Sequence, residues 1–319
     1  MTRAVFLDYG SVAVDGDLDP ARLCAVLPGL VIHEATPEPE VDARIAGAAV
    51  VLCNKARLTR ARIAANRELK LIALTATGTN NVDLEAAREH GVAVCNITDY
   101  CTASVVQHVF AVLLALTHRL REYDRALKAG GWERADGERL PAYPVRELAG
   151  RTLGVVGYGT LGRGVARIAA AFGMRVLVAA RAGGAPEPGR LALPQLLPAV
   201  DVLSLHCPIT PATRGLIGAR ELALMKPDAV LINTARGGLV DAAALAAALR
   251  AGRLGGAAID VLEEEPPVHG SPLLAPDLGN LIVTPHTAWA AREARQRAID
   301  ELAENAAAFL RGERRHRVV

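Results

Sequence analysis

The sequence predicts an α/β protein made of two domains, each built around a parallel β-sheet. Short apolar runs recur along the chain with helix-like segments between several of them, and such alternation gives parallel sheets covered on both faces. The chain has 319 residues, which suits two domains better than one core. Hydrophobic residues make up 51% of it, enough for two buried cores. A glycine-rich turn near the middle marks the start of the second domain.

Composition and charge exclude several kinds of partner. The 36 basic and 34 acidic residues leave a formal net charge of +2, and no basic block contains interleaved aromatics, so no nucleic acid is expected. No apolar run is long enough to cross a membrane, and the first residues lack the layout of a signal peptide. The five cysteines form no CxxC motif, which fits a reduced, cytoplasmic setting without a metal site. The basic tail Arg311–Val319 is expected to be solvated.

The first third of the chain contains five strand-like runs. They are Ala4–Leu7, Leu30–His33, Val50–Cys53, Leu71–Leu74 and Val92–Cys95. A helix-like segment at Leu84–His90 can be capped by Asp83 and ended by Gly91. The small residues of the turn Thr75–Val82 can point backbone N–H groups at an anion such as a carboxylate. Spacing alone favours the plainer interpretation, an ordinary strand-to-helix turn.

A long apolar helix is expected at Thr102–Leu120. Its apolar positions extend most of the way round, so it is buried in the fold or against a second subunit. His108 on this helix is expected to be a core or interface group rather than a catalyst. The polar stretch Ala129–Pro144, which includes Trp132, is too long for a simple connector and is expected to wrap around a structure such as a partner subunit.

The central stretch Arg151–Val178 has the pattern strand, glycine turn, helix, strand. Gly157 suits the tight turn, Gly159 lets a pyrophosphate approach the backbone, and Gly162 lets the helix pack on the strand. An apolar stripe at helical spacing then runs from Leu161 to Phe172. A glycine turn used only for packing would look similar, but the strand and helix around this one favour a bound dinucleotide.

The second domain continues with four strand-like runs, at Val200–His206, Ala229–Asn233, Ala257–Asp260 and Leu281–Thr284. Helices are expected at Asp241–Leu249 and at Ala290–Leu310, and the second would cross back to the first domain.

Polar residues follow three of these strands, where open α/β sheets bind ligands. The residues are Arg236, Glu265 and His286. A guanidinium binds a carboxylate and polarises the adjacent carbonyl, and an imidazole donates a proton to that oxygen as hydride arrives at carbon. A carboxylate beside the imidazole fixes its orientation. The set suits a 2-keto acid, although singly the three could be a surface arginine, a solvated acid and a strand-end hydrogen bonder.

Several motifs occur in the order and spacing of one known family. They are ATGTNNVDL (Ala76–Leu84), VVGYGTLG (Val155–Gly162), LHCPITPATRGLIG (Leu205–Gly218), LINTARGGLVD (Leu231–Asp241), AIDVLEEEPP (Ala258–Pro267) and TPHTAW (Thr284–Trp289). With them the chain resembles the D-2-hydroxyacid dehydrogenase family along nearly its whole length. The Asn-Lys pair of Cys53–Lys55, the ATGTNN segment and the end of TPHTAW most resemble glycerate dehydrogenases, also called hydroxypyruvate reductases.

The resemblance implies two doubly wound parallel-sheet domains with a cleft between them that closes on binding. A flavodoxin-like substrate domain would comprise residues 1–98 and 288–319. A Rossmann dinucleotide-binding domain would comprise residues 99–287, including a dimerisation helix and loop at 102–145 that form a homodimer.

The resemblance also implies reversible hydride transfer between NAD(P) and a small 2-keto or 2-hydroxy acid. Arg236 would bind the substrate carboxylate and carbonyl, His286 would be the acid/base, and Glu265 its partner. The substrate-binding residues would be Asn54, Ala76, Thr77, Gly78, Arg236, His286 and Trp289. The cofactor-binding residues would be Gly157, Gly159, Thr160, Leu161, Gly162, Arg181, His206, Pro208, Thr213, Thr234, Ala235, Arg236, Asp260 and His286.

Two positions depart from the family pattern. Ala180, followed by Arg181, stands where members commonly carry an acid that binds the adenosine ribose. With no carboxylate to repel a 2′-phosphate and a guanidinium beside it, NADPH is favoured; alternatively, Arg181 points into water and NAD(H) binds through its phosphates. Gln107 stands where many members have Glu before a His, which should affect local hydrogen bonds or the interface and not the chemistry.

Hydroxypyruvate and glyoxylate, giving D-glycerate and glycolate, are the favoured substrates. The alternatives are an enzyme of the same family that acts on phosphite or a specialised biosynthetic 2-keto acid, and a dinucleotide-sensing regulator. The intact set of Arg236, Glu265 and His286 argues against the regulator. A formate enzyme of this family would be expected to carry Gln in place of Glu265.

Overall fold

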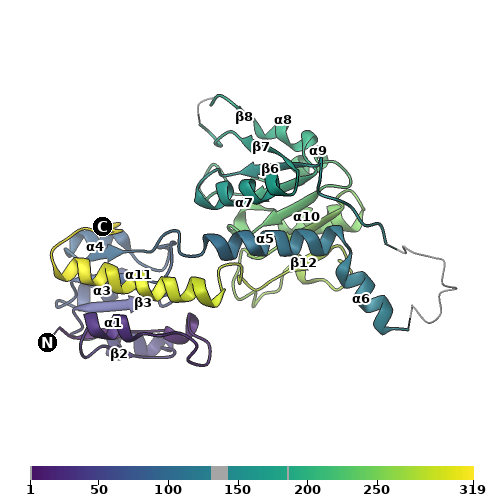
Figure 1. The fold of residues 1–319 in the computed structure, drawn as a ribbon. Coiled ribbons are helices and arrows are strands. Elements are labelled where there is room, and N and C mark those ends of the chain that lie inside the picture. The colour runs from purple at the N-terminus through teal and green to yellow at the C-terminus, as the bar shows by residue number, and fades with distance from the viewer. Residues whose placement is uncertain (1, 131–142, 185–186) are drawn as a thin grey trace. The chain divides into compact units, whose positions relative to one another are not determined.

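The structure is a computed structural model that describes residues 2–130, 143–184 and 187–319. The chain divides into two compact units: unit 1 comprises Met1–Cys101 and Trp289–Val319, and unit 2 comprises Thr102–Ala288. Each unit contains one parallel sheet (Figure 1), which confirms the predicted α/β class with two sheets. Residues 131–142 of the predicted dimerisation loop, including Trp132, lie outside the described residues.

Unit 1 is built around a five-stranded parallel sheet in the order β2-β1-β3-β4-β5. The strands are β1 (Ala4–Phe6), β2 (Val31–Ile32), β3 (Val50–Cys53), β4 (Leu71–Leu74) and β5 (Ala93–Cys95). Val5 of β1 pairs in register with Val31 of β2 and Val51 of β3. All five predicted runs therefore form strands, in the order of a flavodoxin-like sheet.

Helices cover both faces of this sheet, because successive side chains of a strand point to opposite faces. Phe6 packs on one face with α1 (Ala21–Val26) and α11 (Arg292–Leu310), the long yellow helix of Figure 1. Val5 packs on the other face with α2 (Val41–Ile45), α3 (Arg60–Ala65) and α4 (Leu84–Glu89). Asp83 caps α4, as its position predicts, by accepting a hydrogen bond from the backbone N of Ala86 at 2.8 Å.

The C-terminal tail differs from the expectation of a solvated end. Only the first part of Arg311–Val319 is continuously exposed. Further along, Arg317 forms an antiparallel bridge with Cys95 of β5, and the backbone N of Val318 donates to the carbonyl O of Val94 at 2.7 Å. β5 is the edge strand of the sheet, so it offers backbone groups for such pairing. A basic composition does not reveal this docking.

Unit 2 is built around a seven-stranded parallel sheet in the order β12-β11-β10-β9-β6-β7-β8. The strands are β6 (Thr152–Val156), β7 (Arg175–Ala179), β8 (Arg190–Leu191), β9 (Val202–Leu205), β10 (Val230–Asn233), β11 (Gly256–Ile259) and β12 (Leu281–Val283). The chain order reverses at β6, which lies between β7 and β9. Open α/β sheets bind ligands at such a switch point, beyond the carboxyl ends of the strands.

The helices of unit 2 correct one predicted boundary. They are α5 (Thr102–Thr117), α6 (Leu120–Lys128), α7 (Thr160–Ala171), α8 (Leu193–Leu196), α9 (Ala219–Leu224) and α10 (Ala242–Arg250). The expected helix to Leu120 ends at Thr117, and Arg119 adopts a left-handed φ of 53° before α6 begins. The buried apolar pattern ends at Leu116, while α6 buries none of its residues. Within residues 2–130, 143–184 and 187–319 no single helix is long and apolar enough to cross a membrane; α5 and α6 pass that test together, but only as a pair bent by 56°.

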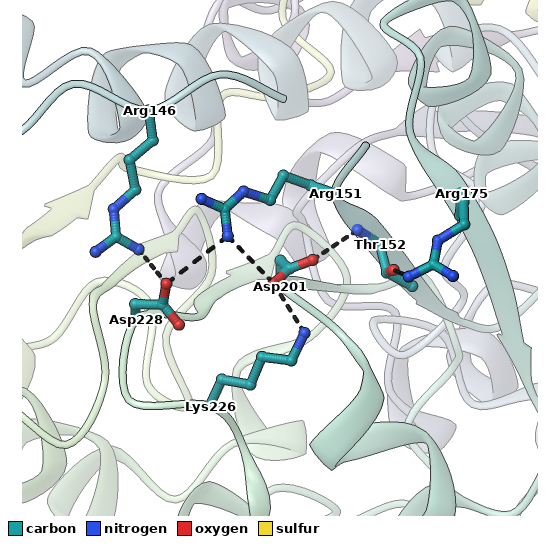
Figure 2. A network of polar contacts seen from close by, with 7 residues as sticks. All are labelled: Arg146, Arg151, Thr152, Arg175, Asp201, Lys226 and Asp228. Atoms are coloured by element: carbon teal, nitrogen blue, oxygen red, sulfur yellow. Dashed lines mark hydrogen bonds and ion pairs between the residues drawn. The ribbon is translucent and has the colours of Figure 1, made fainter. Parts of the chain in front are cut away.

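Charged side chains link the amino ends of the strands of unit 2 (Figure 2). Asp201, directly before β9, accepts hydrogen bonds from the backbone N of Thr152 at 2.7 Å and from Nζ of Lys226 at 2.9 Å. Arg151 lies 3.6 Å from the carboxylate of Asp201 and 3.9 Å from that of Asp228. Burial by itself would raise the pKa of Asp201, but these hydrogen bonds and positive charges together hold it below the ordinary value.

We expect Asp201→Asn to destabilise the protein at neutral pH by about 1–3 kcal/mol, because a neutral amide replaces a charged acceptor of several hydrogen bonds. The folded-state pKa of Asp201 is lowered, so the carboxylate contributes fully above the ordinary aspartate value of about 4 and its contribution is lost as the pH falls through the folded-state pKa. Urea unfolding at several pH values should show the difference from wild type shrinking in acid. A difference that does not change with pH would contradict this assignment. Asp277→Asn, which removes an exposed pair with Arg250, is the control and should have a much smaller effect.

Candidate active site

The glycine turn lies at the switch point of unit 2, between β6 and α7. Gly157 has a φ of 92°, and a Cβ there would lie 2.6 Å from the backbone N of Cys207. A Cβ on Gly162 would lie 2.1 Å from the carbonyl O of Gly157, so α7 packs directly on the turn. A Cβ on Gly159 would meet nothing within 4 Å. The space beside the first helical residues, Thr160 and Leu161, is therefore open where their amides can bind a phosphate.

Two buried polar atoms near this turn fit a bound dinucleotide. Nδ1 of His206 and Oγ1 of Thr234 have no hydrogen-bond partner among the residues that the structure describes. Nε2 of His206 lies 2.8 Å from Oγ of Ser204, and burial lowers the pKa of His206 to about 4, so the ring is neutral at pH 7. Buried polar atoms normally have partners. Polar groups of a cofactor could form hydrogen bonds with both atoms, so the residues present suit the predicted dinucleotide.

Other predicted cofactor residues lie on loops after the strands. Oγ1 of Thr213 donates to the carbonyl O of Pro208 at 2.8 Å and accepts from the backbone N of Thr210 at 2.7 Å, which shapes the turn after β9. Arg181 lies two residues after β7 and is exposed. Its side chain forms no hydrogen bond or ion pair with the rest of the described chain. Arg181 is thus a cation that can bind an external anion.

Arg236 follows β10 in a turn that Asn233 organises. The buried Asn233 accepts from the backbone N of Ala235 at 3.0 Å through Oδ1, and its Nδ2 donates to the carbonyl O of Arg236 at 2.9 Å. Nη1 of Arg236 donates to the carbonyl O of Ala235 at 2.7 Å. A Cβ on Gly237 would lie 2.0 Å from the carbonyl C of Leu262, so this turn lies against the loop after β11. Asn233 was not predicted as a site residue, although its position at the end of an apolar run is a signal.

Glu265 and His286 form a hydrogen-bonded pair between the loops that follow β11 and β12. Nδ1 of His286 lies 2.6 Å from Oε2 of Glu265, and Oε1 accepts from the backbone N of Leu262 at 2.8 Å. A carboxylate only accepts, so Nδ1 carries a hydrogen, and Nε2 is the ring nitrogen left available for acid–base chemistry. The two side chains are 31% and 32% exposed. Of the three residues predicted to converge, these two are in contact, and Arg236 stands on the neighbouring loop.

Asp260 holds the His286 loop (Thr284–Ala288) in place. Its carboxylate, 1% exposed, accepts from Oγ1 of Thr284 at 2.6 Å and from the backbone N atoms of Thr287 and Ala288 at 2.8 and 2.9 Å. Its carbonyl O accepts from the backbone N of His286 at 2.7 Å. His286 has a φ of 56°, a conformation that residues other than glycine rarely adopt, and these bonds maintain it. Organising this loop is a role that the sequence did not reveal for Asp260.

Unit 1 carries its own candidates at the carboxyl ends of its strands. The backbone N–H groups of Ala76, Thr77 and Gly78, after β4, donate to no other residue in the described ranges. Three successive amides without internal partners suit an anion such as a carboxylate. Trp289, where the second part of unit 1 begins, packs edge-on against Tyr100 with the ring centroids 6.5 Å apart.

Asp8, which was not predicted as a site residue, organises the loop that contains Asn54. Its carboxylate accepts from the backbone N atoms of Asn54, Lys55 and Ala56 at 2.8, 2.6 and 2.8 Å. The side chain of Asn54 is buried, and its Nδ2 donates to Oγ of Ser11 at 2.9 Å, whereas Lys55 is exposed. Asp8 directly follows the first apolar run of the chain. In the second domain, site residues were predicted as the polar residues that follow a strand; we call this the strand-end rule. Applied to the first domain, the same rule would have selected Asp8.

Comparisons with known proteins identify the family of this chain. The family model for the NAD binding domain of D-isomer specific 2-hydroxyacid dehydrogenases matches residues 110–288. The glycerate dehydrogenase of Methylorubrum extorquens is 44% identical over 277 residues, which cover 87% of each chain.

Two solved structures extend the likeness over both units. The TT0316 protein from Thermus thermophilus is 37% identical, with a TM-score of 0.86 over 99% of this chain and 100% of the other. The NADPH-dependent glyoxylate/hydroxypyruvate reductase from Sinorhizobium meliloti, in complex with citrate, is 28% identical, with a TM-score of 0.84 over 100% of this chain and 98% of the other. The chain therefore belongs to the D-isomer specific 2-hydroxyacid dehydrogenase family and is an NAD(P)-dependent oxidoreductase that acts on the CH–OH group of its substrates.

Proposed function

We propose that the protein interconverts hydroxypyruvate and D-glycerate, or glyoxylate and glycolate, and that it prefers NADPH to NADH. The observation that carries this proposal is the pair formed by Glu265 and His286, with Arg236 on the adjacent loop. Relatives that are a glycerate dehydrogenase and a glyoxylate/hydroxypyruvate reductase support the choice of a small 2-keto acid.

Each residue of this set has a distinct task in the reducing direction. Arg236 binds the carboxylate of the keto acid with two N–H groups and polarises the C2 carbonyl. His286 donates the proton on Nε2 to the C2 oxygen as that oxygen becomes an alkoxide. Glu265 holds the ring through Nδ1 and stabilises the imidazolium. The bound nicotinamide supplies the hydride. On unit 1 we assign substrate contacts to the amides of Ala76–Gly78, and to Asn54 and Trp289.

The chain offers residues for each part of the dinucleotide. The first turn of α7, with Gly157 to Gly162, would hold the pyrophosphate. His206, Pro208, Thr213, Thr234, Ala235 and Asp260 would lie on the nicotinamide side. Ala180 places no carboxylate at the end of β7, and the neighbouring Arg181 can pair with a 2′-phosphate.

We expect Arg181→Ala to raise the Kd of NADPH by roughly 10- to 100-fold, because a charge-assisted hydrogen bond to the 2′-phosphate is lost. The Kd of NADH should change little. Fluorescence titration with both nucleotides measures the two constants. Arg167→Ala, which removes an exposed arginine of α7, is the matched control. Equal losses for both nucleotides would show that Arg181 does not read the 2′-phosphate.

The reaction itself is tested by following nicotinamide absorbance with a panel of substrates. Hydroxypyruvate, glyoxylate and longer 2-keto acids are each combined with NADPH and with NADH. We expect the fastest turnover with hydroxypyruvate or glyoxylate and NADPH. If the whole panel is silent while cofactor still binds, the proposal is wrong. Phosphite, a specialised biosynthetic keto acid or a regulatory role would then take its place.

We further propose that the protein is a homodimer formed through α5, α6 and the segment that follows them. The side chains of Leu120 and Leu127 on α6 are 56% and 42% exposed, and Val145 is 48% exposed. Leu120 and Leu127 are seven residues apart and so share one face of α6, and an exposed apolar helix face is a candidate interface. Light scattering in solution tests this: a dimer is expected, and a monomer at micromolar concentration would refute the interface.

A further inference from the structure

We propose that His108 is a positioning residue for the acid–base chemistry of His286 and acts through Thr284 and Asp260. The inference rests on the proposed function, because it requires His286 to be the proton donor. His108 lies on α5, within unit 2, and its side chain is 18% exposed. The apolar sequence around it favoured an ordinary core or interface histidine, whereas its contacts with Thr284 and Asp260 point to a role in the His286 loop.

The hydrogen bonds around Thr284 have one consistent direction. Oγ1 of Thr284 lies 2.6 Å from Oδ1 of Asp260 and 3.3 Å from Nε2 of His108. A hydroxyl has a single hydrogen and a carboxylate can only accept, so Thr284 donates to Asp260 and accepts from His108. Nε2 of His108 therefore carries a hydrogen. The donors run in one line from the helix to the buried carboxylate.

That line ends on the carboxylate that fixes the His286 loop. Oδ1 of Asp260 accepts hydrogen bonds from Oγ1 of Thr284 and the backbone N of Thr287, and Oδ2 accepts one from the backbone N of Ala288. Loss of the Thr284 hydroxyl would remove a donor from this buried carboxylate, and loss of His108 would remove the N–H group that orients that hydroxyl. Either change costs free energy, and the loop relaxes to recover a partner. His286 would then leave its left-handed conformation. A shift of about 1 Å in a reacting group can lower turnover by about 100-fold.

His108 also compensates the charge of Asp260 directly. Its Nε2 lies 3.9 Å from Oδ1 of Asp260, whose carboxylate is 1% exposed. The N–H group that faces this oxygen reduces the penalty of keeping a charge away from water. His108 thus supports Asp260 both through the hydroxyl of Thr284 and across space.

The experiment compares variants of the full chain that keep shape and remove donors. His108→Leu and Thr284→Val are the test variants, and His108→Gln offers an amide N–H in place of Nε2. We expect His108→Leu to lower kcat by roughly 10- to 100-fold, with the Kd of NADPH and the KM of hydroxypyruvate nearly unchanged. His108→Gln should recover most of the loss. The double variant His108→Leu/Thr284→Val should lose less than the product of the two single losses, because the two residues share the path through the hydroxyl of Thr284.

A second readout does not depend on turnover. The imidazole N–H that His286 donates to Glu265 should give a downfield proton resonance, assigned by its loss in His286→Ala. His108→Leu and Thr284→Val should shift or broaden this resonance, and His108→Gln should keep it. His90→Leu, which changes an exposed histidine at the end of α4, is the control and should alter neither readout.

Two results would overturn the inference. One is a His108→Leu variant that loses only stability, with kcat and the His286 resonance unchanged. The other is a double variant whose losses multiply. A failure of the proposed function is seen separately, as absent wild-type turnover on every keto acid or full activity of His286→Ala in the same assay, while the resonance still reports whether His108 positions the loop.

Discussion

Replacing His286 by alanine should lower kcat for hydroxypyruvate reduction by about 10²- to 10⁴-fold, the usual contribution of a positioned general acid. Without the imidazole, the alkoxide that forms at C2 must take its proton from water. The Kd of NADPH should change little, because we assign the phosphates to the glycine turn before α7 and not to His286. Steady-state kinetics and a fluorescence titration of the same variant measure the two effects.

The chain contains a matched control for this variant. Nδ1 of His269 lies 2.6 Å from Oε1 of Glu264, the same distance as in the pair of His286 and Glu265, but its side chain is 85% exposed. His269→Ala should therefore leave kcat unchanged. Activity of His286→Ala close to wild type would show that another group supplies the proton.

Replacing Arg236 by alanine should lower kcat/KM by roughly 10²- to 10⁴-fold, since two charge-assisted hydrogen bonds to the substrate carboxylate and the polarisation of the carbonyl are lost together. Arg236→Lys should recover only a small part, because an ammonium group cannot form the paired planar contact of a guanidinium. Kinetics with a series of hydroxypyruvate concentrations separate the change in KM from that in kcat.

Arg220 of α9 is exposed and provides the control for charge alone. Arg220→Ala should leave both kinetic constants at wild-type values. If Arg236→Ala bound hydroxypyruvate with an unchanged KM and turned it over normally, the carboxylate contact would have to lie elsewhere.

The sheets could be predicted from the sequence because their strands are buried on both faces. The apolar runs Val50–Cys53 and Leu71–Leu74 coincide with β3 and β4, since a strand covered on both sides reads as a continuous apolar run. β8 at Arg190–Leu191 was not predicted, because two half-buried residues at a sheet edge leave no such pattern.

The buried face of α7 could not be predicted from its large apolar residues alone. The apolar stripe placed Phe172 on it, yet Phe172 follows the end of the helix, is 39% exposed and stacks on Phe110. The residues that do face α5 are small: a Cβ on Gly164 would lie 2.8 Å from Cγ2 of Val106. Helices that approach this closely require small side chains at the contact, and a search for large apolar residues passes over them.

The site was predictable only as far as the strand-end rule was applied. That rule selected Glu265 and His286, which are in contact. It was not applied to Asp8 or Asn233, whose carboxylate and amide bond to the backbone of neighbouring loops. The contact of His108 with Thr284 joins a helix to a loop 176 residues away. Such contacts depend on how segments far apart in the sequence fold together, which local composition does not reveal.

The charged network of Figure 2 lies at the amino ends of strands of the seven-stranded sheet, and the residues proposed for chemistry follow the carboxyl ends of strands of the same sheet. β6 has five residues, a length of roughly 15 Å, which is beyond the range of about 10 Å over which substitutions usually interact. Changes at the two ends should therefore add independently. Variants selected for a new substrate or nucleotide, which commonly lose stability, can regain it through added or improved ion pairs around Asp201 without altering the new specificity. The residues that can restore stability are therefore separate in space from the residues that would determine a new specificity.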